Sequence, residues 1–284
     1  PMRPIWTSII ALAAGLPAGA GPVAAATVKA DYGIWLGGLP LGNADLATTV
    51  DGQRYKMQLQ VRLTGLAGLL TGGKGAATAM GSVGGPTPVP SSFAITSQSS
   101  SAQRTVRMGL SGGAVAALDI SPPLDDRIER VPVREAHKRG VVDPVSALMM
   151  PAAARGALTD PANCNRTIPV FDGGARFDIV LRYSETKTVE KPGYKGPVIV
   201  CSARYVAISG HRADRPSAKF MEDNRDMWVW LAPVESARLL LPMRIEVKTA
   251  SGMSLIEASR WSTEGEAKIV PATTGATEAP PAVE

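Results

Sequence analysis

Histidine, cysteine and aromatic residues are scarce in this sequence. Its 284 residues include two histidines, two cysteines and only 5% aromatic residues. His137 and His211 are far apart, and no closely spaced cysteine and histidine pairs of the kind that bind zinc are present. We therefore expect neither a metal site nor a cofactor, and we predict a protein that is not an enzyme.

The sequence also lacks a cluster of positive charge. The net charge is +5, but the lysine and arginine residues are scattered among the predicted strands. Nucleic-acid-binding proteins gather their basic residues on one face, so no nucleic-acid partner is predicted. Weak attraction to anionic lipid headgroups or envelope polymers is left open.

The apolar run at the N-terminus is typical of a secretory signal peptide. Arg3 precedes apolar residues 5–16, then prolines and glycines, and then alanines 24–26. The run is shorter than the roughly 20 residues that span a bilayer, so no transmembrane anchor is predicted. We expect residues 1–26 to be a signal peptide. Because no cysteine follows directly to accept a lipid, the mature protein is predicted to be soluble in the periplasm.

The remainder is predicted to be one mainly β domain, residues 27–263, followed by a disordered tail, residues 264–284. The clearest strand is residues 54–63, where apolar and polar side chains alternate without a fault. Similar alternation recurs along the chain, and residues 65–85, rich in glycine, predict a loop or a kinked strand. About ten or eleven antiparallel strands are expected from this pattern.

One short amphipathic helix is expected to pack on the sheet. Asp143 is placed as its N-cap and Pro144 as its first residue, with Val145, Leu148 and Met149 on one stripe. The predicted helix covers residues 143–154, with Pro151 bending or ending it.

The two cysteines stand at the ends of a segment that predicts a β-hairpin and a third strand. Cys164 precedes the hairpin, and Cys201 shares the apolar face of the third strand. An exported protein favours a disulfide between them, because such bonds persist outside the cytosol. Two unrelated buried thiols are the alternative.

A serine hydrolase is a further hypothesis. Ser111 lies in a Gly-x-Ser-x-Gly sequence, which matches the nucleophile elbow of serine hydrolases, and Asp125 and Asp126 form a carboxylate pair. That elbow requires a helix after the serine, whereas residues 114–120 alternate as a strand does. A hairpin turn at Ser111 is therefore favoured.

Four segments resemble a known family: residues 32–46, 142–148, 170–173 beside Cys164, and 241–245. Together they are similar to the proteobacterial exported family catalogued as domain of unknown function 3108, across about residues 31–261. The family has no established reaction. Its resemblance in build to periplasmic lipoprotein carriers implies a curved antiparallel sheet, or half-barrel, with an apolar concave face.

These observations favour a non-enzymatic envelope protein that binds or carries a lipid or acyl chain on the concave face. The alternative is a scaffold protein for envelope integrity that binds a protein or cell-wall partner. The residues expected to line an apolar ligand cavity come from two strands and the predicted helix: Tyr55, Met57, Leu59, Val61, Leu148, Met149, Trp228 and Trp230.

The disulfide hypothesis predicts a loss of stability on reduction. Closing a loop of this length restricts the unfolded chain, which stabilises the fold by about 4 kcal/mol. Cys164→Ser and Cys201→Ser should each lower the melting temperature, and reductant should do the same to the wild type. A melting temperature that reductant leaves unchanged would show that no important bridge exists.

Overall fold

The protein is a single rolled antiparallel β-sheet. The computed structural model describes residues 25–264 except 66–67, 69–71 and 154, so most of the predicted signal peptide and tail lie outside the described residues. The strands are β1 (Ala26–Leu36), β2 (Leu39–Asp51), β3 (Arg54–Leu63), β4 (Lys74–Ser82), β5 (Val89–Gln98), β6 (Gln103–Ser111), β7 (Ala114–Ser121), β8 (Met150–Pro151), β9 (Arg166–Phe171), β10 (Arg176–Lys191), β11 (Tyr194–Ser209), β12 (Met227–Val234), β13 (Leu239–Thr249) and β14 (Gly252–Glu264).

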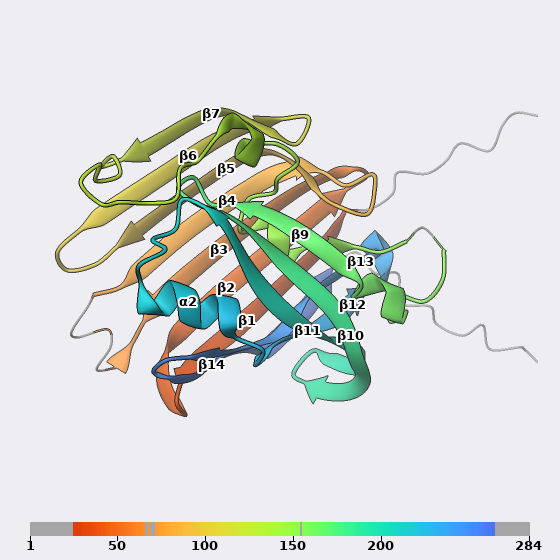
Figure 1. Cartoon of the computed structure of the whole chain (residues 1–284). Helices are drawn as coiled ribbons and strands as arrows, with labels where there is room; N and C mark the ends of the chain where they lie inside the picture. Colours follow the sequence, from red (N-terminus) through yellow and green to blue (C-terminus); the bar gives the residue numbers. More distant parts are fainter. Residues whose placement is uncertain (1–24, 66–67, 69–71, 154, 265–284) are drawn as a thin grey trace, which may run out of the picture.

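The strand order is β7-β6-β5-β4-β3-β2-β1-β14-β13-β12-β11-β10-β9, and β8 pairs with β13 outside this path. The mainly β, antiparallel fold class predicted from the sequence is confirmed. The sheet curls so that β9, β10 and β11 cross in front of β1 to β4 (Figure 1). At the β9–β10 turn, a Cβ atom on Gly173 would lie 2.5 Å from the side chain of Val106 on β6, so the two ends of the sheet face each other.

The described sheet has 14 strands, more than the predicted ten or eleven. β4 was hard to predict because its sequence, KGAATAMGS, consists mostly of glycine, alanine and small polar residues. Its small residues make room for neighbouring strands: a Cβ atom on Gly81 would lie 2.8 Å from the ring of Tyr55 on β3. The two-residue strand β8 is too short to produce an alternating pattern.

Residues 139–151, which we call the strap, run through the hollow of the sheet. At its start the strap bridges the two sheet edges, because Arg139 pairs with Ala114 of β7 and Val142 pairs with Val170 of β9. At its end, Met150 of β8 pairs with Leu240 of β13. The strap therefore links β7 and β9, the two ends of the strand order, and connects both of them to β13.

The helix predicted over residues 143–154 is wrong. The strap contains only a 3₁₀ turn, η2 (Ser146–Leu148), followed by extended backbone at Met149 and then β8. Pro151 has no N–H for a helical hydrogen bond and disfavours helical geometry at the residue before it. The short α-helix α2 (Pro216–Asp223) lies instead between β11 and β12, with Pro216 as its first residue.

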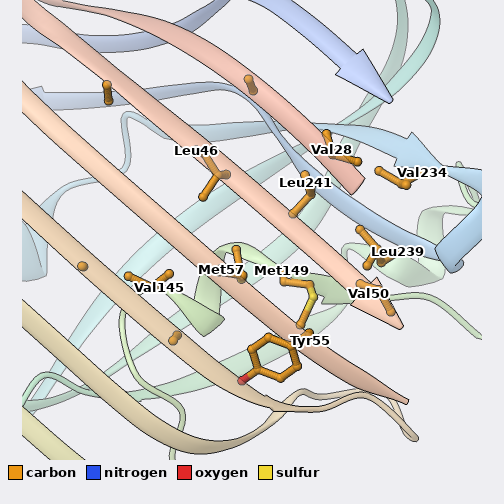
Figure 2. Close-up of a cluster of buried hydrophobic side chains, with 14 of the residues drawn as sticks. Val28, Leu46, Val50, Tyr55, Met57, Val145, Met149, Val234, Leu239 and Leu241 are labelled. Atoms are coloured by element: carbon orange, nitrogen blue, oxygen red, sulfur yellow. The ribbon is translucent and has the colours of Figure 1, made fainter. Parts of the chain in front are cut away.

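The strap fills one half of the hollow. Val141, Val145 and Met149 are buried in a cluster with side chains of β1 to β6 and the first part of β13. Met149 lies among Tyr55 and Met57 of β3, Val50 of β2 and Leu239 of β13 (Figure 2). Val142 and Met150 belong to a second cluster, which is formed by β9 to β13.

The sheet splits between β13 and β14. Arg244 to Thr249 of β13 pair with β14, whereas Leu239 and Leu240 pair with β8. Where β13 no longer pairs with β14, the tip of the β10–β11 hairpin contacts β14 instead. There the N–H of Trp261 donates to the carbonyl oxygen of Pro192 (2.8 Å). The strap thus enters the sheet where two neighbouring strands separate.

The predicted disulfide is confirmed. Cys164 and Cys201 are bonded, with their Cα atoms 5.5 Å apart, and both residues are fully buried. Cys164 follows the 3₁₀ turn η3 (Pro161–Asn163), and Cys201 lies on β11. The bond therefore fastens the segment that enters β9 to a strand two positions away in the sheet.

The close packing of the β10–β11 hairpin tip on β14 predicts that position 193 requires glycine. Gly193 has φ +86°, and a Cβ atom there would lie 1.7 Å from the carbonyl oxygen of Trp261, which the sheet holds in place. Gly193→Ala should therefore destabilise by more than about 4 kcal/mol, at the upper end of single substitutions.

Gly52 in the β2–β3 turn is the matched control. Its φ is also positive, +57°, but a Cβ atom there would meet no atom of the described residues within 4 Å. Gly52→Ala should cost only the backbone strain of about 1–2 kcal/mol. Equal losses in urea denaturation of the two variants would contradict the close packing of the hairpin tip on β14.

A candidate apolar binding cavity

An apolar cavity of about 210 Å³ lies in the half of the hollow that the strap does not fill. Its walls are side chains from five adjacent strands: Ile168, Val170, Phe177, Ile179, Leu181, Ala203, Met227, Val229, Ile245 and Val247. Glu246 is the only residue with a charged side chain among the described lining residues, and it pairs with Arg244. The site therefore offers apolar contact and almost no polar recognition.

Strand register explains why these side chains share one face. Residues directly opposite each other in antiparallel strands point to the same side of the sheet. Leu181 of β10 is opposite Ala203 of β11, and Val229 of β12 is opposite Ile245 of β13. Alternate residues along each strand extend the same apolar wall.

The strap provides the opposite wall through Pro144, Ala147, Leu148 and Met150. A buried carboxylate sets the conformation of this wall. Oδ1 of Asp143 accepts hydrogen bonds from the backbone N–H groups of Val145 and Ser146, each 2.9 Å long. These bonds hold the strap in the 3₁₀ turn that presents Ala147 and Leu148 to the cavity.

The hydroxyl of Ser146 links this turn to the sheet. It donates to Oδ2 of Asp143 (2.5 Å) and lies 2.7 Å from the hydroxyl of Tyr55 on β3. Asp143 and Ser146 are fully buried, and Tyr55 is 3% exposed. Burial raises the pKa of Asp143, although the hydrogen bonds from Ser146 and Val145 oppose the shift. Burial likewise raises the pKa of the Tyr55 hydroxyl.

The residues predicted to line a cavity are divided by the strap. Leu148 and Trp228 line the cavity. Tyr55, Met57 and Met149 lie in the filled half (Figure 2). Leu59 and Val61 pack against that cluster. Trp230 also packs there, with the cationic groups of Lys187 and Arg244 over its ring at 4.8 and 5.1 Å.

Sequence reasoning missed most of the cavity walls. The predicted site combined residues of β3 and β12 with the predicted helix, and it left out Phe177, Ile179 and Leu181, which alternate along β10 and line the cavity. A signal that could have located the cavity is the apolar face shared by β10 and β11, beside the buried Cys201.

The geometry at Ser111 differs from that of a hydrolase elbow. Ser111 ends β6, Gly112 and Gly113 form the turn with φ +57° and +75°, and β7 rather than a helix follows. Asp125 is ion-paired with Arg127, and this hydrogen bond lowers its pKa. The described residues include no group of three or more potential metal ligands and no helix long and apolar enough to cross a membrane.

A rolled antiparallel sheet with an apolar hollow defines the general class of this protein. The profile of the family described as protein of unknown function DUF3108 matches residues 27–256. The chain belongs to this family, as its sequence motifs indicated. No curated protein matches the chain in sequence.

A solved structure similar to the chain is a β-barrel-like protein of domain of unknown function DUF1849 from Brucella abortus. The two have 10% sequence identity and a TM-score of 0.46, and the similarity covers 84% of this chain and 98% of the other.

The raised pKa of Asp143 predicts a specific pH dependence of stability. In the window between its ordinary and raised pKa values, the folded protein keeps a proton that the unfolded chain releases. The free energy of unfolding contributed by this group is therefore greatest below the ordinary pKa and falls as pH rises above about 4.

Asp143→Asn keeps an oxygen acceptor but cannot ionise. The stability of the wild type relative to Asp143→Asn should decrease as pH rises above about 4, whereas Asp143→Ala should be destabilised throughout because two buried N–H groups lose their acceptor. Denaturant unfolding at several pH values measures both effects. Parallel pH profiles for the wild type and Asp143→Asn would contradict the role of a buried carboxylate.

Proposed function

We propose that this protein is a non-enzymatic periplasmic protein that binds an acyl chain in the cavity between the strap and strands β9 to β13. The observation that carries the proposal is the apolar lining of that cavity, formed by five strands and the strap. Apolar cavities stay dry and take up apolar ligands. Binding would remove apolar ligand surface from water, which stabilises the complex by about 25 cal/mol per Å².

The cavity size restricts the ligand. Its volume of about 210 Å³ is smaller than the roughly 300–1,000 Å³ typical of small-molecule sites. It therefore suits a single acyl chain or part of one, and not a complete lipid with several chains. Because the strap fills the other half of the hollow, the ligand would lie on the side of β9 to β13.

A scaffold function for envelope integrity is the second candidate. It is favoured by exposed apolar side chains beside two adjoining turns, those between β1 and β2 and between β13 and β14: Leu39 at the start of β2 is 70% exposed, and Met253 at the start of β14 is 37% exposed. The two turns are joined by a hydrogen bond from the N–H of Gly37 to the carbonyl oxygen of Met253 (2.9 Å). In this view the rolled sheet presents a surface to a protein or cell-wall partner, and the cavity has no role.

Filling the cavity should abolish acyl-chain binding. Ala203 is 7% exposed and lies on its wall, so the ring of Ala203→Phe would occupy the space of the ligand. We expect at least about a tenfold loss of affinity for a fluorescent fatty acid, equivalent to about 1.4 kcal/mol. Native mass spectrometry of the protein purified from its own envelope should show a bound acyl chain in the wild type and less in the variant.

Ala94→Phe on β5 is the matched control, because Ala94 is exposed and does not line this cavity. Ile179→Phe fills the site from another strand and guards against a folding defect particular to Ala203→Phe. A wild type recovered only at its apo mass, without affinity for fatty acids, would refute the acyl-chain proposal. Full rescue of a gene-deletion strain by cavity-filled protein would favour the scaffold function.

A further inference from the structure

We infer that the bound ligand is an anionic amphiphile, whose carboxylate or phosphate head group is held by Arg104 and Arg130 at one end of the apolar cavity. The inference rests on the proposed acyl-chain function and specifies the chemistry of the ligand.

A second, more polar cavity adjoins the apolar one. It has a volume of about 290 Å³, and Pro144 of the strap lines both cavities. The wall of the apolar cavity ends with Val170 on β9 and Phe177 on β10, and the polar cavity continues beyond them with Asp172 and Ala175 of the intervening turn. A ligand could therefore place an apolar chain in one space and a polar head in the next.

Arg104 lies at the beginning of β6 and lines the polar cavity. It belongs to the same face as Val106, which points into the hollow, because alternate residues of a strand share a face. Within the part of the chain that the structure describes, its guanidinium has neither an ion pair nor a hydrogen bond. An unpaired cation at the rim of an apolar site is suited to an anion.

Arg130 lines the same cavity from the loop after β7. Its Nη1 donates to the carbonyl oxygen of Gly210 (3.2 Å), but its Nε is buried and has no partner among the described residues. On either side of Gly210, the Ser209 hydroxyl and Nδ1 of His211 are also buried, and neither has a partner in the part of the chain that the structure describes. Buried polar groups normally have hydrogen-bond partners, so these unpaired atoms indicate a polar ligand or water at this end.

The charge balance of the polar cavity favours an anion. Asp172 is its only acidic lining residue among the described residues, against the two arginines. Oδ1 of Asp172 already accepts from the N–H groups of Gly174 and Ala175, at 2.8 and 2.7 Å. Guanidinium groups bind carboxylates and phosphates through paired hydrogen bonds, which gives both kinds of head group the same recognition chemistry.

The test compares ligands that share an alkyl chain and differ in the head. Dodecanoic acid, dodecyl phosphate and dodecanol are titrated against the full-length protein and against Arg104→Gln and Arg130→Gln. We expect the wild type to bind at least one anionic ligand about tenfold or more tightly than the alcohol, the factor expected for a charged hydrogen bond. Each variant should lose this preference while its affinity for dodecanol stays unchanged.

Arg107→Gln is the matched control, because Arg107 lies on the opposite face of β6 and is ion-paired with Asp119. Because Arg104 is exposed, Arg104→Gln is expected to fold. This variant still tests the inference if Arg130→Gln fails to fold. A preference for the acid or for the phosphate identifies the head group.

Equal affinities for all three ligands, unaffected by the arginine substitutions, would overturn the head-group inference and leave the acyl-chain proposal standing. No binding of any of the three would refute both.

Discussion

A sheet that rolls up must fill its concave side, and the strap meets this requirement. The hollow between β1 to β5 and β9 to β13 would otherwise expose apolar side chains of both walls to water, at a cost proportional to their area. Val145 and Met149 fill one half by packing among β2, β3 and β13 (Figure 2), and Val141 belongs to the same buried cluster. On the other side, Ala147 and Leu148 leave an apolar space. The cavity is thus defined by where the strap stops filling the hollow.

The strap can do this only if its own polar backbone is satisfied inside the protein. Asp143 accepts two N–H groups of the 3₁₀ turn, and Ser146 connects the same carboxylate to Tyr55 of the sheet. β8 gives the end of the strap a strand partner in β13, at the point where β14 has separated from it. The disulfide fastens the β9 side of the hollow to β11. The hydrogen bonds of Asp143 and Ser146, the pairing of β8 with β13 and the disulfide each fix the position of a cavity wall.

Local patterns predicted the parts of this fold that depend on neighbouring residues. The uninterrupted alternation of residues 54–63 corresponds to β3, and the cysteine pair was recognised from the strand faces and the predicted export. The strap was misjudged because Asp143 accepts nearby backbone N–H groups as a helix N-cap would, yet only the 3₁₀ turn Ser146–Leu148 follows. Pro151 and the pairing of β8 with β13 favour extended backbone after that turn. We predicted that β3 lines the cavity, because the sequence pattern does not show which half of a rolled sheet will be filled by a segment distant in sequence.

Under the proposed function, the two halves of the hollow differ, because the strap fills one half and the other half admits an acyl chain. Methyl NMR during titration with a fatty acid tests it most directly, because both halves carry isoleucine, leucine or valine methyl groups. We expect chemical-shift changes for Ile179, Leu181, Ile245 and Val247, which line the cavity. We expect none for Leu46, Val50, Leu239 and Leu241, which pack around the strap. Shifts in the second group without shifts in the first would contradict it.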